Sequence, residues 1–384
     1  MQTFPIGAAV TRAELTADPH PALARLRAAE PVSWLPELGC WLVTSRAEAV
    51  TVLREPATFT VDDPRFSTAQ VIGSSMLSLD GAAHSRVRRP FVAPFRPARV
   101  ADRFTAGIVE HAQELVTGFR AAGRAELRTA FAGPLAVRVV AATLGLADID
   151  PATVLGWYTT FVTAVSDVTA GAVVPPEAVA AFATLTEHVL GGIDGHDSLL
   201  ADAVAGGLQR DETVSNAAVL LFGGIETTEG MILNLLRHLL ESPEQLAAVL
   251  ADIGLLASAV EESLRLEPAA AVVDRYATRD VELAGASIRR GDPVTVSLAG
   301  ANRDPVTFPG PDAFDLHRPN LRQHLAFAQG PHVCPGMDLA RLETRLGVRT
   351  LLAELPGLAL DAARPSAPTG LVFRKPQALH ARWH

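Results

Sequence analysis

The apolar residues of this chain recur mostly at the spacing of helix faces, and only a few short segments alternate as strands do. The pattern predicts helices at about 46–54, 82–91 and 98–119, several more across roughly 126–210 with a loop near 171–176, the longest at about 212–240, and one at 257–266. Strand patterns lie at 32–34, 39–44, 271–277, 281–283, 287–289 and 293–298, and a terminal hairpin should pair 371–373 with 379–383. The expected fold class is mainly α with small β-sheets (α+β).

Composition and charge favour one soluble domain over residues 1–384. No compositional break looks like a linker, and the β-rich part is expected at about 30–60, 271–300 and 367–384. The net charge of −9 argues against nucleic acid as a partner. No basic, apolar leader begins the chain, and no uncharged apolar run reaches the roughly 20 residues that span a bilayer. We therefore expect a cytoplasmic protein that does not bind membranes.

Cys334 is the first candidate for chemistry. It is one of only two cysteines, and it lies in the segment FAQGPHVCPGMDLAR, residues 327–341, directly before a helix-period apolar run. The helix N-terminus favours a thiolate, and Gly330 and Gly336 allow tight turns around it. A lone thiolate on a loop suits a metal, and haem iron is the natural candidate. The simpler alternative is a small buried hydrophobic residue, as most lone cysteines are; no Cys-x-x-Cys or Cys-x-x-Cys-His run points to zinc or c-type haem.

The long predicted helix carries a second signal. It is apolar nearly all round, yet it contains Gly223, Gly224, Glu226 and Thr227. One interpretation is that the glycines allow close helix packing and that Glu226 faces solvent. The other is a locally opened helix over a planar cofactor, where Thr227 holds water and Glu226 passes protons inward.

These motifs resemble those of the cytochrome P450 family over almost the whole chain. Positions of the haem-binding loop that match are Phe327, Gly330, His332, Cys334, Gly336, Leu339, Ala340 and Arg341, and the order Gly-Gly-x-acid-Thr at 223–227 matches the family's oxygen-activation motif. The chain departs from the family at Ala328, where Gly is usual, and at Pro335, where an aliphatic residue is more common.

The resemblance implies haem b, with Cys334 as the iron ligand and Glu226 and Thr227 as the catalytic pair. Residues implied to contact the cofactor are His84, Arg88, Gly223, Gly224, Arg275, Phe327, Gly330, His332, Cys334 and Gly336, of which His84, Arg88, Arg275 and His332 would bind the propionates. It also implies that Glu262 and Arg265, one turn apart on a helix, form a buried network with a third residue, either Arg318 or Arg303. By itself such a pair is more often exposed and weak.

The implied activity is a haem-thiolate monooxygenase that inserts one oxygen atom from O₂ into a small apolar organic substrate, such as a natural-product intermediate. Regions expected to line its pocket are 66–77, 161–174, 222–227, 269–273 and 370–373. Electrons would come from a separate ferredoxin and an NAD(P)H-dependent ferredoxin reductase, docking near Arg86, Arg89, Arg341 and Arg345, and the protein would be a monomer. Two alternatives stay open: a peroxide-driven or non-oxygenating haem-thiolate enzyme, and a catalytically silent haem-binding sensor.

Overall fold

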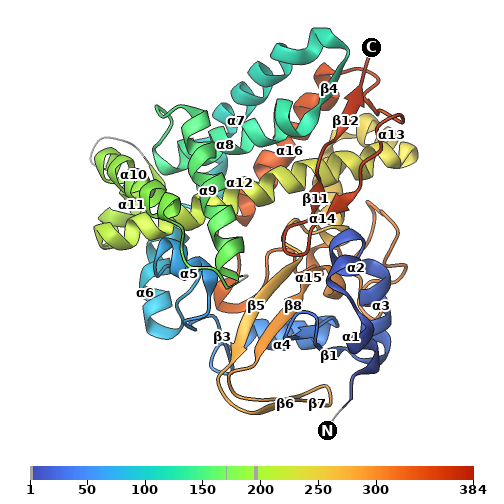
Figure 1. Cartoon of the computed structure of the whole chain (residues 1–384). Coiled ribbons are helices and arrows are strands. Elements are labelled where there is room, and N and C mark those ends of the chain that lie inside the picture. Colours follow the sequence, from blue (N-terminus) through green and yellow to red (C-terminus); the bar gives the residue numbers. More distant parts are fainter. Residues whose placement is uncertain (1–2, 170, 194–197) are drawn as a thin grey trace.

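The computed structural model describes residues 3–169, 171–193 and 198–384, and helices dominate it (Figure 1). The α-helices are α1 Pro5–Ala9, α2 Arg12–Ala17, α3 His20–Ala29, α4 Arg46–Arg54, α5 Ser67–Ile72, α6 Gly81–Val92, α7 Pro97–Phe119, α8 Gly133–Leu144, α9 Pro151–Thr169, α10 Pro176–Ile193, α11 Leu199–Ala205, α12 Arg210–Glu241, α13 Pro243–Ala251, α14 Leu256–Leu266, α15 Leu298–Ala301 and α16 Met337–Glu354. Short turns of other helix types are η1 Arg120–Ala122, η2 Arg128–Ala132, η3 Ile253–Leu255, η4 Leu321–Gln323 and η5 Gly330–His332.

The strands form small sheets rather than one large one. They are β1 Val32–Leu35, β2 Cys40–Val43, β3 Phe59–Thr60, β4 Arg124–Glu126, β5 Val272–Ala277, β6 Val281–Leu283, β7 Ala286–Ile288, β8 Pro293–Ser297, β9 Ala359–Leu360, β10 Pro368–Thr369, β11 Lys375–Pro376 and β12 His380–Arg382. The main sheet has the order β1-β2-β8-β5-β3, and only β2 and β8 run parallel in it. The main sheet lies on one side of the molecule, and the helices α7, α8 and α16 lie on the other (Figure 1). Helices α9 and α12 lie between these two parts.

Helix α12 forms the centre of the core. A reciprocal capping box between Gln209 and Glu212 starts it, and it packs against α8, α9, α10, α14 and α16. Among the described residues it alone is long and apolar enough to cross a membrane, but 72% of its most apolar window is buried inside the protein. It therefore has the character of a core helix. Its neighbour α16 packs along α7, which places the start of α16 against the same core.

Most of the predicted elements are confirmed, including α4 at the expected residues and the longest helix at α12. The pattern missed the helices α1 to α3, α5, α13 and α15 and the short strands β3, β4, β9, β10 and β11. The terminal hairpin was wrong. Strand β12 pairs instead with β4 and β9, and the hairpin of this region joins β10 to β11.

The reason for this error is a competing set of backbone hydrogen bonds. Ala271 N–H donates to the Val372 carbonyl at 2.8 Å, and Arg374 N–H donates to the Ala269 carbonyl at 2.9 Å. The segment 371–373 is therefore held beside the start of β5 and is not available to β12. Alternating side chains predict a strand, but they do not name its partner.

Candidate active site

The loop before α16 presents the Cys334 thiol. Cys334 N–H donates to the Phe327 carbonyl at 2.9 Å, which closes the loop, and Gly336 N–H donates to the Cys334 sulfur. Gly330 has φ +73°, and a Cβ there would lie 2.3 Å from the Leu53 carbonyl oxygen. Only glycine fits such a position, so the loop depends on it. The thiol carried by this loop belongs to an unpaired cysteine.

The electrostatics at Cys334 favour a metal ligand rather than a free thiolate. Burial raises the pKa of the Cys334 thiol, while the Gly336 N–H and the positive charges of Arg88 and Arg341 act in the opposite direction. A bound metal cation would supply the remaining stabilisation that a thiolate needs. No group of three or more His, Cys, Asp or Glu residues suited to a metal ion occurs within the described residues. The donor set is a single sulfur, which suits haem iron and does not suit zinc.

Three of the four basic side chains expected to bind the propionates lie in or beside this loop, namely His84, Arg88 and His332. His84 and Arg88 lie on α6, and Arg88 donates to the Val333 carbonyl, next to the thiol. The rings of His84 and His332 lie 4.3 Å apart, and His84 Nε2 is buried with no hydrogen-bond partner among the described residues. Arg275 on β5 is also buried. Burial lowers the pKa of His84 to about 4, with the charges of His332 and Arg88 adding to the effect.

Asp80 is a member of this group that the sequence did not reveal. Its Oδ1 lies 2.8 Å from His332 Nε2, and its Oδ2 accepts hydrogen bonds from the Thr60 hydroxyl and the Val61 N–H. Burial opposes ionisation, but these bonds outweigh it and lower the pKa of Asp80 to about 2. One carboxylate thus faces several cations and an unpartnered ring nitrogen. The remaining positive charge fits anionic groups such as the two propionates of haem.

The two glycines of α12 have different surroundings. A Cβ on Gly224 would lie 2.6 Å from a methyl group of Val140 on α8, so this glycine allows close helix packing. A Cβ on Gly223 would meet no heavy atom within 4 Å, so that face of α12 has room for a flat group. Close helix packing is therefore confirmed for Gly224, whereas Gly223 leaves an open face on α12.

The predicted local opening of α12 was wrong. The helix is continuous from Arg210 to Glu241, and the Thr227 hydroxyl donates to the Gly223 carbonyl at 2.5 Å. This bond satisfies the hydroxyl within the helix, which removes the need for an opened turn. Thr227 nevertheless lies one helical turn after Gly223, so it is next to the open face of α12.

Glu226 does not face solvent; it belongs to a buried charged cluster. Lys375 Nζ lies 2.8 Å from Glu226 Oε2 and 2.8 Å from Glu229 Oε1, and the Tyr158 hydroxyl donates to Glu226 Oε2. Arg128 Nε donates to Glu229 Oε1 at 2.7 Å. Sequence reasoning missed these partners. The signal that could have found them is two acids one turn apart on an apolar helix in a chain with a single lysine, Lys375.

The Glu262 network is buried, and its third member is Arg318. Arg265 donates to both oxygens of Glu262 at 2.7 and 2.8 Å, and Arg318 Nε donates to Glu262 Oε1 at 3.0 Å. Arg303 is the wrong candidate, because it binds Asp312 and a backbone carbonyl instead. Glu262 and Arg265 are fully buried.

Two of the arginines expected to contact a ferredoxin are already in ion pairs. Arg86 binds Glu212, and Arg341 Nε lies 2.6 Å from Glu261 Oε1 while its guanidinium lies over the Phe327 ring. Arg341 thus also braces the loop that carries Cys334.

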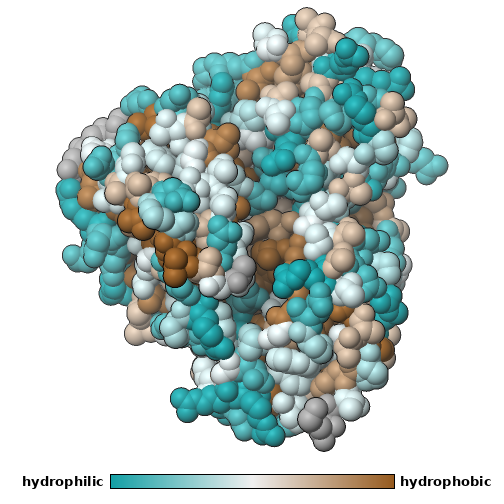
Figure 2. All heavy atoms as spheres, viewed as in Figure 1, coloured by the Kyte–Doolittle hydropathy of each residue, from teal (hydrophilic) through white to brown (hydrophobic). Residues whose placement is uncertain are grey.

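An apolar cleft of about 260 Å³ lies over one face of the main sheet. It includes parts of three regions predicted to line the substrate pocket, represented by Thr169, Ala271 and Leu371. Figure 2 shows an apolar hollow on this side of the molecule, between α9 and α2. The ring centroids of Phe222 and Phe373 lie 5.6 Å apart, so α12 contacts the segment 370–373.

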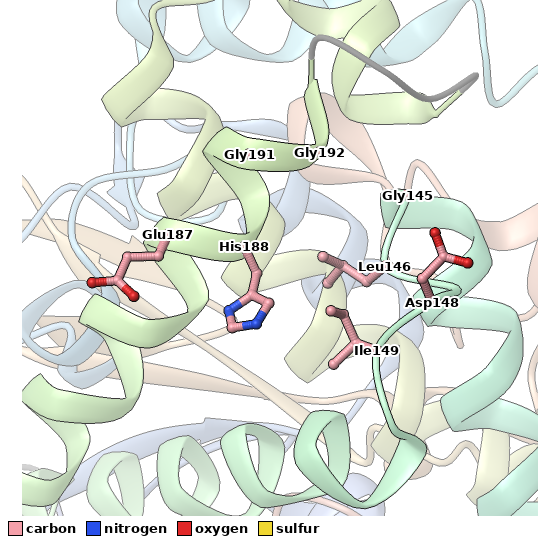
Figure 3. Close-up of a pocket in the computed structure, with 8 residues that line it drawn as sticks. All are labelled: Gly145, Leu146, Asp148, Ile149, Glu187, His188, Gly191 and Gly192. Carbon is pink, nitrogen blue, oxygen red and sulfur yellow. The ribbon is translucent and has the colours of Figure 1, made fainter.

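A second hollow, of about 410 Å³, lies between the end of α8 and α10 (Figure 3). The His188 ring points toward Leu146 and Ile149, and Glu187 points away from them. This hollow contains neither a predicted site residue nor a part of the five regions predicted to line the substrate pocket.

These features are typical of a haem-thiolate protein. They are a single thiol on a loop, basic side chains beside that loop, and a core helix that carries an acid–alcohol pair. Comparison with known proteins agrees. The family model described as Cytochrome P450 matches residues 247–366. The chain is 36% identical over 398 residues to the cytochrome P450 monooxygenase PikC of Streptomyces venezuelae, covering 96% of this chain and 92% of PikC. It is 34% identical to mycinamicin IV hydroxylase/epoxidase of Micromonospora griseorubida, covering 93% and 94% of the two chains.

The fold agrees as well. The crystal structure of P450BioI in complex with hexadec-9Z-enoic acid ligated acyl carrier protein has a TM-score of 0.87 and 28% identity, covering 97% of this chain and 100% of the other. The chain belongs to the cytochrome P450 family. It is an oxidoreductase that incorporates oxygen, and its cofactor is haem.

Proposed function

We propose that this protein is a monooxygenase that inserts one oxygen atom from O₂ into an apolar natural-product intermediate, with electrons from a separate ferredoxin and NAD(P)H-dependent ferredoxin reductase. The observation that carries the proposal is the Cys334 loop: its sulfur accepts the Gly336 N–H, and the half-buried Arg88 lies beside it. We also propose that the chain forms one domain and acts as a monomer in the cytoplasm.

In this proposal the residues around the loop bind the cofactor. Cys334 would ligate the iron, and the thiolate would be surrounded by Phe327, Gly330 and Gly336. The propionates would be bound by His84, Arg88, Arg275 and His332. The porphyrin ring would lie along Gly223 and Gly224. Haem, when bound, supplies an iron centre that activates O₂, and a thiolate ligand favours O–O cleavage. The protein itself has to place the substrate, limit water and deliver protons.

Glu226 and Thr227 are assigned to proton delivery. The Thr227 hydroxyl donates to the Gly223 carbonyl, so its oxygen can accept a hydrogen bond from a water on the open face of α12. Glu226 carries its carboxylate one residue earlier, in buried surroundings. Positioned acid groups of this kind contribute about 10²- to 10⁴-fold to the rate.

The substrate class follows from the lining of the cleft. Aliphatic side chains such as Leu23, Leu42 and Leu371 line most of it, and few aromatic residues do. Relatives named for pentalenic acid, mycinamicin IV and 20-oxo-5-O-mycaminosyltylactone support a natural-product intermediate. The proposed substrate is therefore bulky and largely apolar.

The absorption spectrum of the reduced, carbon-monoxide-bound protein tests the proposed ligation, because a thiolate ligand moves the Soret band strongly to the red. Product formed per NAD(P)H consumed, measured with a surrogate ferredoxin and reductase, then tests the reaction. Turnover only with peroxide would favour the peroxide-driven alternative. A thiolate spectrum without turnover by either route, across compounds that shift the haem spin state, would favour a sensor.

A further inference from the structure

The buried cluster around Glu226 contains the only lysine among the 33 Lys and Arg residues of the chain. Lys375 lies on β11, and its side chain is 5% exposed. Its Nζ is 2.8 Å from both Glu226 Oε2 and Glu229 Oε1. The chain uses arginine for every other strongly basic position, so the choice of lysine here is a distinct property of this site.

The cluster is balanced in charge. Glu226 and Glu229 are two carboxylates, and Lys375 and Arg128 supply two positive charges. Buried charges of this kind are tolerated only when they are paired. Gly133 leaves room for Glu229, because a Cβ at that position would lie 2.9 Å from its Oε2.

The contacts form a line from solvent to Glu226. Arg128 is 34% exposed and donates to Glu229 Oε1, the same oxygen that Lys375 contacts. On its other side Lys375 contacts Glu226 Oε2. Glu226 Oε1 accepts no hydrogen bond from the described residues, so this oxygen is available to a water. Glu226 is therefore connected to the partly exposed Arg128 through three short contacts.

Lysine and arginine differ in their ability to release a proton, which matters for a chain of contacts that could carry protons. An ammonium is compact, and it can give up a proton; a guanidinium keeps its protons in proteins. Arginine would hold two carboxylates as well as lysine does, or better. A cation that only had to bind Glu226 and Glu229 would not need to be lysine.

This inference rests on the role proposed for Glu226. We propose that Lys375 is a proton-carrying residue that recharges Glu226 from solvent by way of Glu229. When Glu226 has given up its proton, an N–H bond of Lys375 breaks and an O–H bond forms at Glu226 Oε2. A proton from solvent near Arg128 then binds the Glu229 carboxylate and passes on to Nζ, which leaves Glu229 ionised again. One proton moves inward, and Lys375 ends as an ammonium.

Lys375→Arg separates proton transfer from charge. The variant keeps the positive charge, so the thiolate spectrum and substrate-induced spin shift should remain. Product formation should fall about tenfold or more if a general acid has lost its proton supply, and the solvent isotope effect should rise. Glu229→Gln should have a similar effect, and the double variant should be no worse than the more impaired single one, because both changes block one route. Wild-type product formation in Lys375→Arg, or additive losses in the double variant, would overturn the proposal.

Two comparisons complete the design. Arg289→Lys makes the same type of exchange, in reverse, at an exposed pair with Asp280 and should leave turnover unchanged. Tyr158→Phe removes the other donor to Glu226 Oε2 and should matter far less than Lys375→Arg. A large loss in Tyr158→Phe together with normal turnover in Lys375→Arg would place proton entry on the α9 side and would refute the route through Lys375.

A measurement without turnover keeps the inference separate from the proposed function. Protein labelled with ¹⁵N-lysine gives one side-chain signal, from Lys375, and Arg289→Lys adds an exposed reference. Glu229→Gln should shift the Lys375 signal and slow hydrogen exchange at Nζ severalfold, whether or not the enzyme turns over. An unchanged signal and exchange rate would refute the link to Glu229, even if monooxygenase activity were established.

Discussion

Arg265→Ala should destabilise the protein more than almost any other single change. Arg265 is fully buried and donates to both oxygens of Glu262 and to the carbonyls of Asn302, Pro311 and Ala313. It thereby ties α14 to the segments that lead toward the Cys334 loop. Alanine removes all of these donors at once and leaves acceptors in a site that excludes water.

The size of the effect follows from these contacts. Removing one member of a buried ion pair costs about 3–5 kcal/mol. Arg318 still binds Glu262, which offsets part of this cost, but three carbonyls also lose a donor, at about 1–3 kcal/mol each where water does not replace it. Because domains are stable by only about 5–15 kcal/mol, a loss of about 3–5 kcal/mol is severe. At about 2–4 °C per kcal/mol, the melting temperature should fall by roughly 6–20 °C.

The assay is thermal unfolding of haem-loaded protein, followed in parallel by circular dichroism and by the Soret band. Arg289→Ala is the control, since the Arg289–Asp280 pair is 70% and 61% exposed and should contribute less than about 1 kcal/mol. Arg265→Lys keeps the charge but loses the bidentate geometry, so its melting temperature should lie between those of wild type and Arg265→Ala. Equal shifts for Arg265→Ala and Arg289→Ala, with full haem loading in both, would refute the reasoning.

Three further changes test other parts of the site. Cys334→Ser should abolish the thiolate spectrum and activity, whereas Cys40→Ser should keep both; a normal spectrum in the Cys334 variant would contradict the ligand assignment. Thr227→Ala should keep the spectrum but divert reducing equivalents from product, measured as product per NAD(P)H, and unchanged coupling would mean another proton route. Burial raises the pKa of Glu343 from 4.5 to about 8, so the folded protein keeps a proton that the unfolded chain releases, and stability falls as pH rises through this window. Glu343→Gln should therefore gain stability over wild type with rising pH, by at most about 1.4 kcal/mol per pH unit in denaturant unfolding; parallel pH curves would show that the carboxyl is already ionised.

Local signals predicted local structure well. The helix at 46–54 and the strand at 281–283 have the expected bounds, because helical or alternating periodicity and turn residues define both ends. The Cys334 loop was also predictable, since the positions of Gly330 and Gly336 relative to the sulfur are fixed within a few residues. The terminal hairpin failed because strand pairing depends on contacts that are distant in the sequence. Asp80 was missed for the same reason: it meets His332 across 252 positions.

For buried charges, only part of the structure could be predicted from the sequence. An acid on an apolar helix must have a partner, and this requirement can be read from the sequence. The identity of that partner cannot be predicted from the sequence unless a motif limits the candidates. For Glu262 a family motif reduced the candidates to Arg318 and Arg303, and the fold selected Arg318. For Glu226 no motif named a partner, and the cation came from a strand 149 positions away. Such a distant partner can differ between chains that share every local motif, so the proton route is where members of one family can diverge while the thiolate loop stays the same.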